Sequence, residues 1–338
     1  MNMTAEGYRS LLAGIGDSSE TTYVIGHKNP DSDSVGSAMA FAYLLRALGM
    51  EAEAAVCGAV NNETRYVLDL FGLQAPDILE NAEGRRIALV DHSSYAQAVP
   101  GAEKATITAV LDHHGMGDIA DGSLFWIRCA PVGATASLVF LTYMECVVAI
   151  PADMARVMLM GILSDTRGMA RNVSTLDRVA YDALVEIAQI PGLDTLYGSM
   201  AGALASYGEM DDLAIFMSDY KEYSAGGKRF GVAVANAMGE EEVRRMAQRM
   251  EALMEEVLAE RDIDMLFVIV NNKGSDESEN MMYMMAFGDG AEELLEMLYH
   301  NGDGDHFYVF KENLSRKTSV VPAIIEGMCQ GDVSADTF

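Results

Sequence analysis

The first half of the chain alternates short β-branched runs with helical patterns, and this alternation constrains the fold more than any other feature. Runs with the length of strands occupy residues 21–26, 51–56, 85–90 and 106–111, and helical periodicity follows the first two of them. Parallel strands need long crossover connections, which helices usually provide. The pattern therefore predicts an α/β domain with a parallel sheet covered by helices.

The remainder of the chain predicts more helices and then a second, smaller α/β domain. Helical periodicity runs from 133 to 189, and a connecting helix and linker follow at about 190–218. Beyond it, strand patterns at 228–237, 265–272 and 280–288 surround one long helix predicted over 240–261. We expect a first domain at 1–195, a connecting segment at 196–216 and a second domain at 217–338.

Composition excludes several classes of protein. The formal net charge of −28 argues against a nucleic-acid partner, because phosphate backbones are bound by clustered Lys and Arg. The chain has no apolar run of roughly 18 to 20 residues, and its start, MNMTAEGYRS, lacks the pattern of a signal peptide, so we expect a cytoplasmic protein without a membrane partner. Its four cysteines are widely scattered, which indicates reduced thiols.

The sharpest local signal is the segment HKNPDSDS at 27–34, which lies between a predicted strand and a predicted helix. It places three possible metal ligands, His27, Asp31 and Asp33, within seven residues. A simpler interpretation is that one residue of 31–34 caps the following helix. Capping alone does not explain the histidine or the second aspartate.

Acidic and imidazole groups recur after two further predicted strands. One strand ends in Asp91-His92, and the next ends in Asp112-His113-His114. A single histidine is often structural. The carboxyl ends of parallel strands lie at one edge of a sheet, so the repetition predicts that these side chains form a common site.

Asp165 follows an apolar helical stretch, where a carboxylate is costly unless it faces a metal, a cation or water. A helix-end turn is the alternative. Carboxylates and imidazoles without thiolates suit Mn, Co, Mg or Zn, and shared carboxylates suggest two ions. Two ions can generate hydroxide and neutralise charge at phosphorus, which is the requirement of phosphoryl transfer. Arg316 and Lys317 would supply cations for phosphate oxygens, although SRKTS could equally be a solvated loop.

Taken together, the motifs HKNPDSDS, LVDH, LDHH, ILSDT and SRKTSVVP resemble the ordered motif set of the family II, manganese-dependent inorganic pyrophosphatases of the DHH phosphoesterase superfamily. The resemblance extends through NNETRYVLDLFG, PVGATASLV and SDYKEY, and so covers about residues 20–325. It implies a DHH domain joined to a smaller DHHA2 domain, with the active site in the cleft between them. It also implies a homodimer formed through the first domain.

The resemblance assigns roles to individual residues. It implies two Mn²⁺ ions, with Co²⁺ as a possible replacement, and an additional Mg²⁺ that arrives with the substrate. One ion would be held by His27, Asp31 and Asp91, and the other by Asp33, Asp91, His113 and Asp165. His114 would face the substrate as a hydrogen-bond donor or acid, and His92 would support the ligands.

The remaining implied residues bind the substrate. Lys221, Arg316 and Lys317 of the second domain would contact the oxygens of pyrophosphate. The implied reaction is the hydrolysis of pyrophosphate to two phosphates by a hydroxide that the two metals activate, with His114, Asp91 and Asp33 as catalytic residues. No nucleotide-sensing domains are inserted between the two halves.

Three departures from the family pattern bear on the substrate. The family usually reads HKNPDTDS and SRKKQVVP, whereas this chain has Ser32 in the first motif and Thr318-Ser319 in the last. Cys129-Ala130 stand before PVG, where the family usually has Glu. Two alternatives therefore stay open: a DHH phosphoesterase acting on a nucleotide or short oligonucleotide, and a metal- or nucleotide-binding regulatory protein without turnover.

Overall fold

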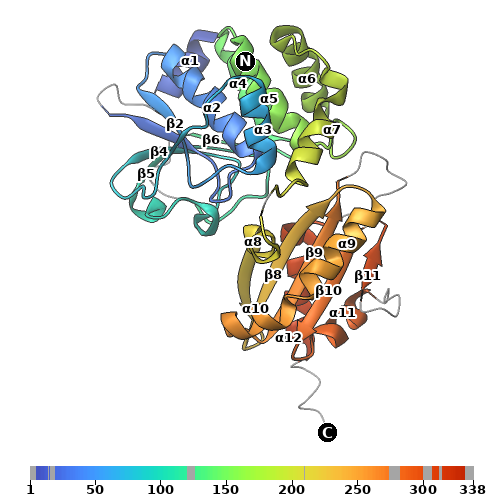
Figure 1. The fold of residues 1–338 in the computed structure, drawn as a ribbon. Coiled ribbons are helices and arrows are strands. Elements are labelled where there is room, and N and C mark those ends of the chain that lie inside the picture. The colour runs from blue at the N-terminus through green and yellow to red at the C-terminus, as the bar shows by residue number, and fades with distance from the viewer. Residues whose placement is uncertain are drawn as a thin grey trace. The chain divides into compact units, whose positions relative to one another are not determined.

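Each of two compact units of the chain contains its own β-sheet (Figure 1). The units are Met1–Met200 and Ala201–Phe338. The computed structural model describes residues 5–13, 15, 20–119, 126–208, 210–273, 282–299, 307–311 and 314–331. Within these ranges no helix is both long and apolar enough to cross a membrane.

The first unit is built on a six-stranded parallel sheet, which confirms the predicted fold class. The strand order is β3-β2-β1-β4-β5-β6. The strands are β1 (Thr22–Ile25), β2 (Ala52–Val56), β3 (Asp77–Ile78), β4 (Arg86–Val90), β5 (Thr106–Asp112) and β6 (Trp126–Cys129). The chain runs outward in one direction from β1 to β3 and in the other from β4 to β6. Neighbouring connections therefore diverge between β1 and β4, and in open α/β sheets ligands bind at the carboxyl ends of the strands at such a point.

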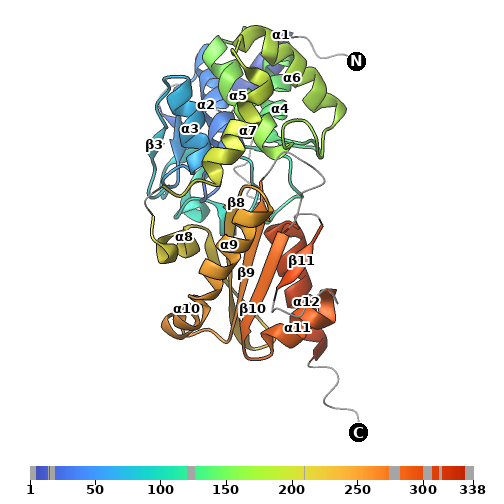
Figure 2. The same cartoon turned by 45° about the vertical axis from the view of Figure 1, so that its right-hand side comes forward.

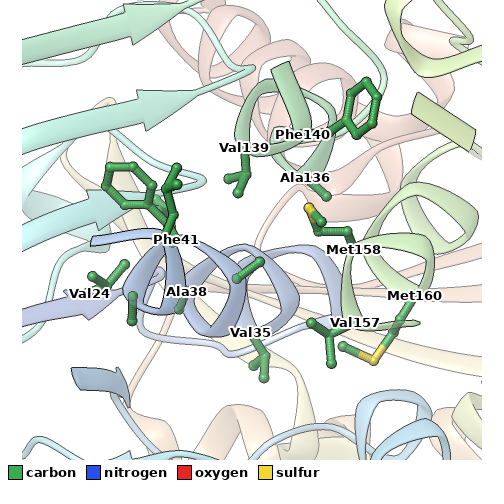
Figure 3. Close-up of a cluster of buried hydrophobic side chains, with 14 of the residues drawn as sticks. Val24, Val35, Ala38, Phe41, Ala136, Val139, Phe140, Val157, Met158 and Met160 are labelled. Carbon is green, nitrogen blue, oxygen red and sulfur yellow. The ribbon is translucent and has the colours of Figure 1, made fainter. Parts of the chain in front are cut away.

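Helices cover one face of this sheet. They are α1 (Ala5–Ala13), α2 (Ser32–Ala47), α3 (Asn62–Leu70), α4 (Thr135–Cys146), α5 (Ala152–Asp165), α6 (Thr175–Ala188) and α7 (Leu193–Leu204). Figure 3 shows the core where α2, α4 and α5 meet, with Phe41 and Val35 of α2 near Val139 of α4 and Val157 of α5. Gly36 is required here, because a Cβ atom would lie 2.2 Å from the carbonyl oxygen of Val157.

The opposite face of the first sheet has a different cover. Ile25, Ile87 and Leu89 of the strands pack there against Val99 and Ile119, which lie in the connections that follow β4 and β5. Two short 3₁₀ turns, Tyr95–Gln97 and Ala102–Lys104, lie on this side. Both faces of the central strands β1, β4 and β5 are therefore buried, as their continuous apolar runs indicate.

The second unit has a five-stranded mixed sheet (Figure 2). Its order is β11-β10-β9-β8-β7, and only β8 and β9 are parallel. The strands are β7 (Tyr220–Ala225), β8 (Lys228–Ala237), β9 (Met265–Asn272), β10 (Met282–Gly288) and β11 (Tyr308–Phe310). The helices are α8 (Asp212–Ser218), α9 (Glu240–Glu251), α10 (Met254–Arg261), α11 (Ala291–Tyr299) and α12 (Val321–Gly331). Helices α9 and α10 pack on one face, and α11 and α12 on the other.

The prediction of one long helix over 240–261 is wrong, because two helices, α9 and α10, occupy that range. The N–H of Leu253 donates to the carbonyl oxygen of Met250 at 3.1 Å, a three-residue spacing that tightens the backbone between them. The bend keeps Met250 of α9 and Met254 of α10 in one core against the sheet. Apolar spacing continues through the bend, so periodicity alone did not reveal it.

Candidate metal centre

The six predicted metal ligands converge at the carboxyl edge of the first sheet. Strand ends supply three of them: His27 follows β1, Asp91 follows β4 and His113 follows β5. Helix ends supply the others: Asp31 and Asp33 at the start of α2, and Asp165 as the last residue of α5.

Asp31 caps a helix and also lies among the candidate metal ligands. Its Oδ1 accepts a hydrogen bond from the N–H of Ser34 at 3.0 Å and so caps α2. Its Oδ2 lies 3.1 Å from Nε2 of His27, and the same nitrogen lies 3.3 Å from Oδ2 of Asp91. Burial opposes protonation of His27, but the two adjacent carboxylates outweigh it and hold the pKa of His27 well above its usual range. Helix capping and ligand placement are therefore compatible at Asp31.

Asp33 is fully buried against the start of α4. Its Oδ2 accepts from the N–H of Thr135 at 2.6 Å, and its Oδ1 accepts from the N–H of Ala136 at 2.9 Å. The N-terminus of a helix favours negative charge. Burial and the charge of Asp91 nevertheless raise the pKa of Asp33 to about 8. A bound cation would relieve this strain on the ionised form.

The ring of His113 is oriented so that one nitrogen faces the carboxylates. Its Nδ1 lies 3.1 Å from the carbonyl oxygen of Val132. A carbonyl oxygen can only accept a hydrogen bond, so Nδ1 carries a proton. Its Nε2 lies 3.3 Å from Oδ1 of Asp91 and 3.4 Å from Oδ2 of Asp165, and is buried without a hydrogen bond. Burial disfavours the charged ring, but Asp91 and the other carboxylates outweigh it and raise the pKa of His113 to about 11. A metal ion would take the place of that proton.

Asp91 is the centre of the cluster. Its backbone is left-handed, with φ of +63°, a conformation that costs a side chain about 1 kcal/mol or more and is concentrated at functional sites. Oδ1 of Asp91 accepts from the hydroxyl of Thr135 at 3.1 Å. Burial opposes ionisation, but contacts with His113 and His27 outweigh it and hold the pKa of Asp91 well below its usual value. Asp91 is thus a buried carboxylate that remains charged.

The donor set fits divalent metal ions. Among the residues that the structure describes, three groups each offer ligand atoms that lie within 4.8 Å of one another, and Asp91 belongs to all three: His27–Asp31–Asp91, Asp33–Asp91–His113–Asp165 and Asp91–His113–His114. Burial and the charge of Asp33 raise the pKa of Asp165 well above its usual range. Crowded carboxylates with an unpartnered imidazole nitrogen are the arrangement that a pair of cations would stabilise.

His114 is held by an aspartate whose role the sequence did not reveal. Oδ1 of Asp112 accepts from the backbone N–H of His114 and lies against its Nδ1, both at 2.9 Å. A carboxylate at Nδ1 keeps a proton there and leaves Nε2 for another partner. About a third of the His114 side chain is exposed.

His92 lies beside the cluster but outside the three ligand groups. Its Nδ1 is 3.0 Å from the carbonyl oxygen of Val90. Burial lowers the pKa of His92 to about 4, so the ring is neutral at physiological pH. Its place next to Asp91 suits packing against the strand end, and the predicted supporting role remains a proposal.

The predicted substrate-binding cations lie in the second unit. Arg316 begins a π-helical turn, Arg316–Val320, that leads into α12, so the segment is not the solvated loop considered as an alternative. Its guanidinium bonds the carbonyl oxygen and Oδ1 of Asp219, each at 2.8 Å, just before the strand that carries Lys221. Lys221 is half-buried and Lys317 is exposed. The structure thus brings Arg316 to the start of β7.

Comparisons with known proteins agree with this division. Residues 21–162 match the N-terminal domain of the DHH family, and residues 199–326 match the DHHA2 domain. The chain is therefore a two-domain protein of the DHH class.

Its relatives define the family more narrowly. The manganese-dependent inorganic pyrophosphatase of Bacillus subtilis is 31% identical over 315 residues, which are 92% of this chain and 100% of the relative. A protein of Archaeoglobus fulgidus named for the same activity is 40% identical over 223 residues, 62% of this chain and 69% of the relative. A crystal structure from Methanococcus jannaschii, assigned to family II inorganic pyrophosphatases, has a TM-score of 0.75 at 27% identity and covers 91% of this chain and 99% of its own. This chain belongs to the family II, manganese-dependent inorganic pyrophosphatases.

Proposed function

We propose that the chain hydrolyses inorganic pyrophosphate to two phosphates. The observation that carries the proposal is the convergence of carboxylate and imidazole atoms around Asp91, which suits two divalent ions. The pyrophosphatases among its relatives cover most of the chain and support the same substrate.

The ligands divide into two sets that share Asp91. His27, Asp31 and Asp91 would hold one ion, and Asp33, Asp91, His113 and Asp165 the other. Mn²⁺ is the expected metal, and Co²⁺ suits the same donors, whereas Mg²⁺ would accompany the substrate. When bound, such ions lower the pKa of water and neutralise charge on phosphoryl oxygens.

The remaining chemistry belongs to side chains of this protein. Arg316, Lys317 and Lys221 would bind the oxygens of pyrophosphate, and the planar guanidinium of Arg316 suits two oxygens at once. His114 would donate a hydrogen bond or a proton to the substrate from Nε2, while Asp112 keeps its ring in place. Thr318 and Ser319, in place of Lys and Gln, leave fewer donors for the phosphate, so we expect weaker substrate binding than in a chain with SRKKQ.

The test is phosphate release from pyrophosphate with Mn²⁺, Co²⁺ or Mg²⁺, beside ATP, tripolyphosphate and a dinucleotide. Fast release from pyrophosphate that is lost in Asp91→Ala would support the proposal. Activity confined to a dinucleotide would move the chain to the other DHH phosphoesterases. Mn²⁺ binding without any turnover would instead favour a regulatory protein.

The resemblance also supports a homodimer formed through the first domain. Light scattering of the purified protein tests the assembly. A monomer at the working concentration would contradict it.

A further inference from the structure

Glu63, a buried carboxylate that no ligand group includes, lies behind the metal centre. It is the second residue of α3 and only 4% exposed. Its Oε2 accepts from the hydroxyl of Ser32 at 3.1 Å and from the hydroxyl of Ser164 at 2.8 Å. A buried carboxylate is costly unless it is well hydrogen-bonded, so its presence calls for a function.

The two serines are chain neighbours of proposed metal ligands. Ser32 lies between Asp31 and Asp33, and Ser164 directly precedes Asp165. A single oxygen atom of Glu63 therefore joins the start of α2 to the end of α5, and these two helix ends carry three of the six proposed ligands.

The start of α3 is itself attached to the first motif. The N–H of Asn61 donates to the carbonyl oxygen of Pro30 at 3.3 Å, and Oγ1 of Thr64 lies 3.1 Å from Oγ of Ser32. Asn61 also caps α3 through the N–H of Thr64. The helix N-terminus stabilises the negative charge of Glu63. The first turn of α3 is thus a firm base for the Glu63 side chain.

We propose that Glu63 is a positioning residue that fixes the spacing between Asp31 and Asp33 on one side and Asp165 on the other. The inference rests on the proposed function and assigns no contact between Glu63 and metal or substrate. Groups that orient metal ligands typically change metal affinity about 10- to 100-fold when removed. Glu63 contacts the chain neighbours of the proposed ligands and not the ligands themselves. We therefore expect an effect on metal affinity at the lower end of that range.

The experiment measures Mn²⁺ binding to the metal-free protein without substrate, by electron paramagnetic resonance titration. Glu63→Ala should weaken binding about tenfold and broaden the signal of bound Mn²⁺. Glu63→Gln keeps an acceptor oxygen for the serines and should stay within about threefold of the wild type. Ser164→Ala removes one donor and should weaken binding by a smaller factor even if Glu63→Ala does not fold.

Glu145→Ala is the matched control. Glu145 is a partly buried glutamate of the same unit that pairs with Arg128, away from the ligands. Equal losses of Mn²⁺ affinity in Glu63→Ala and Glu145→Ala would overturn the inference, because the effect would then be general destabilisation. Wild-type binding in both Glu63→Ala and Ser164→Ala would overturn it too, and so would a Glu63→Gln variant as weak as Glu63→Ala.

Asp91→Asn separates this inference from the proposed function. If Asp91→Asn abolishes Mn²⁺ binding while the Glu63 variants bind normally, the positioning role is wrong and the metal centre stands. If Mn²⁺ binding survives Asp91→Asn, the proposed centre itself is wrong.

Discussion

The two units of the molecule differ in how they hold their charged side chains. The first unit buries carboxylates and imidazoles at the edge of a parallel sheet and holds them with backbone amides, as at Asp33. The second unit carries the proposed substrate-binding cations on β7 and in the turn before α12, where Lys317 is exposed while Arg316 is anchored by Asp219. The groups proposed to hold metal are thus fixed by hydrogen bonds, whereas one of the cations proposed to bind phosphate is open to solvent. Metal binding and substrate binding should therefore respond to different mutations.

The largest effect is expected in the first unit. Asp91→Asn should lower pyrophosphate hydrolysis about 1000-fold, or about 4 kcal/mol in activation free energy, because Asp91 belongs to every ligand group. Steady-state phosphate release measures the loss. Asp153→Asn, at a half-exposed carboxylate paired with Arg156, is the matched control and should leave the rate unchanged. Retention of wild-type activity by Asp91→Asn would contradict the role proposed for the first unit.

Metal should stabilise the first unit selectively. At a free concentration of 100 times its Kd, Mn²⁺ should stabilise that unit by about 2.7 kcal/mol, because only the folded unit assembles the ligands. Hydrogen exchange of individual peptides measures this protection, which should appear in β1, β4, β5 and α5 and be reversed by a chelator. Equal protection of β8 and β9 would show that the two units do not respond separately.

A substitution in the second unit should affect substrate without affecting metal. Arg316→Lys should lower kcat/KM for pyrophosphate about 30-fold, or about 2 kcal/mol, because lysine cannot make two parallel hydrogen bonds to phosphate oxygens. Mn²⁺ affinity of the metal-free protein should not change. Arg229→Lys is the control, since Arg229 is more exposed and pairs with Glu222. A matching fall in Mn²⁺ affinity would contradict the division of roles.

The smallest effect concerns pH and the metal-free protein. Folding raises the pKa of Asp33 to about 8 and that of His113 to about 11. The protonated groups therefore stabilise the folded unit fully below the pKa values of the unfolded chain. This stabilisation is lost as the pH rises toward the folded pKa values. Because Asp33 is half-ionised at pH 8, its titration should cost the first unit about 1 kcal/mol between pH 7 and pH 8.

Urea unfolding followed by hydrogen exchange measures this loss in each unit. The shifted pKa values in the described part of the second unit include those of several tyrosines and of Arg249, and these lie further above neutrality than usual. The second unit therefore serves as the internal control. A first unit whose stability is constant from pH 7 to pH 8 would show that the buried cluster is not under electrostatic strain.

Sequence patterns predicted the buried parts of the fold and missed its edges. Strands β1, β2, β4 and β5 have apolar runs because they are buried, whereas β6 alternates half-buried and exposed residues and β3 has only two residues. The same patterns placed the candidate ligands at one edge of the sheet, because His27, Asp91 and His113 follow buried strands. They could not reveal Thr135 as the partner of Asp33, since a hydrogen bond between residues 102 positions apart leaves no periodic trace.

The distribution of the ligands along the chain has a consequence for biosynthesis. The proposed set begins at His27 and ends at Asp165, which closes α5. A growing chain cannot assemble the full set until α5 has been synthesised and packed on the sheet. The ion proposed for the set that includes Asp165 therefore cannot guide the early folding of the first unit. Its effect falls on the finished structure, where it should slow unfolding while leaving the folding rate nearly unchanged.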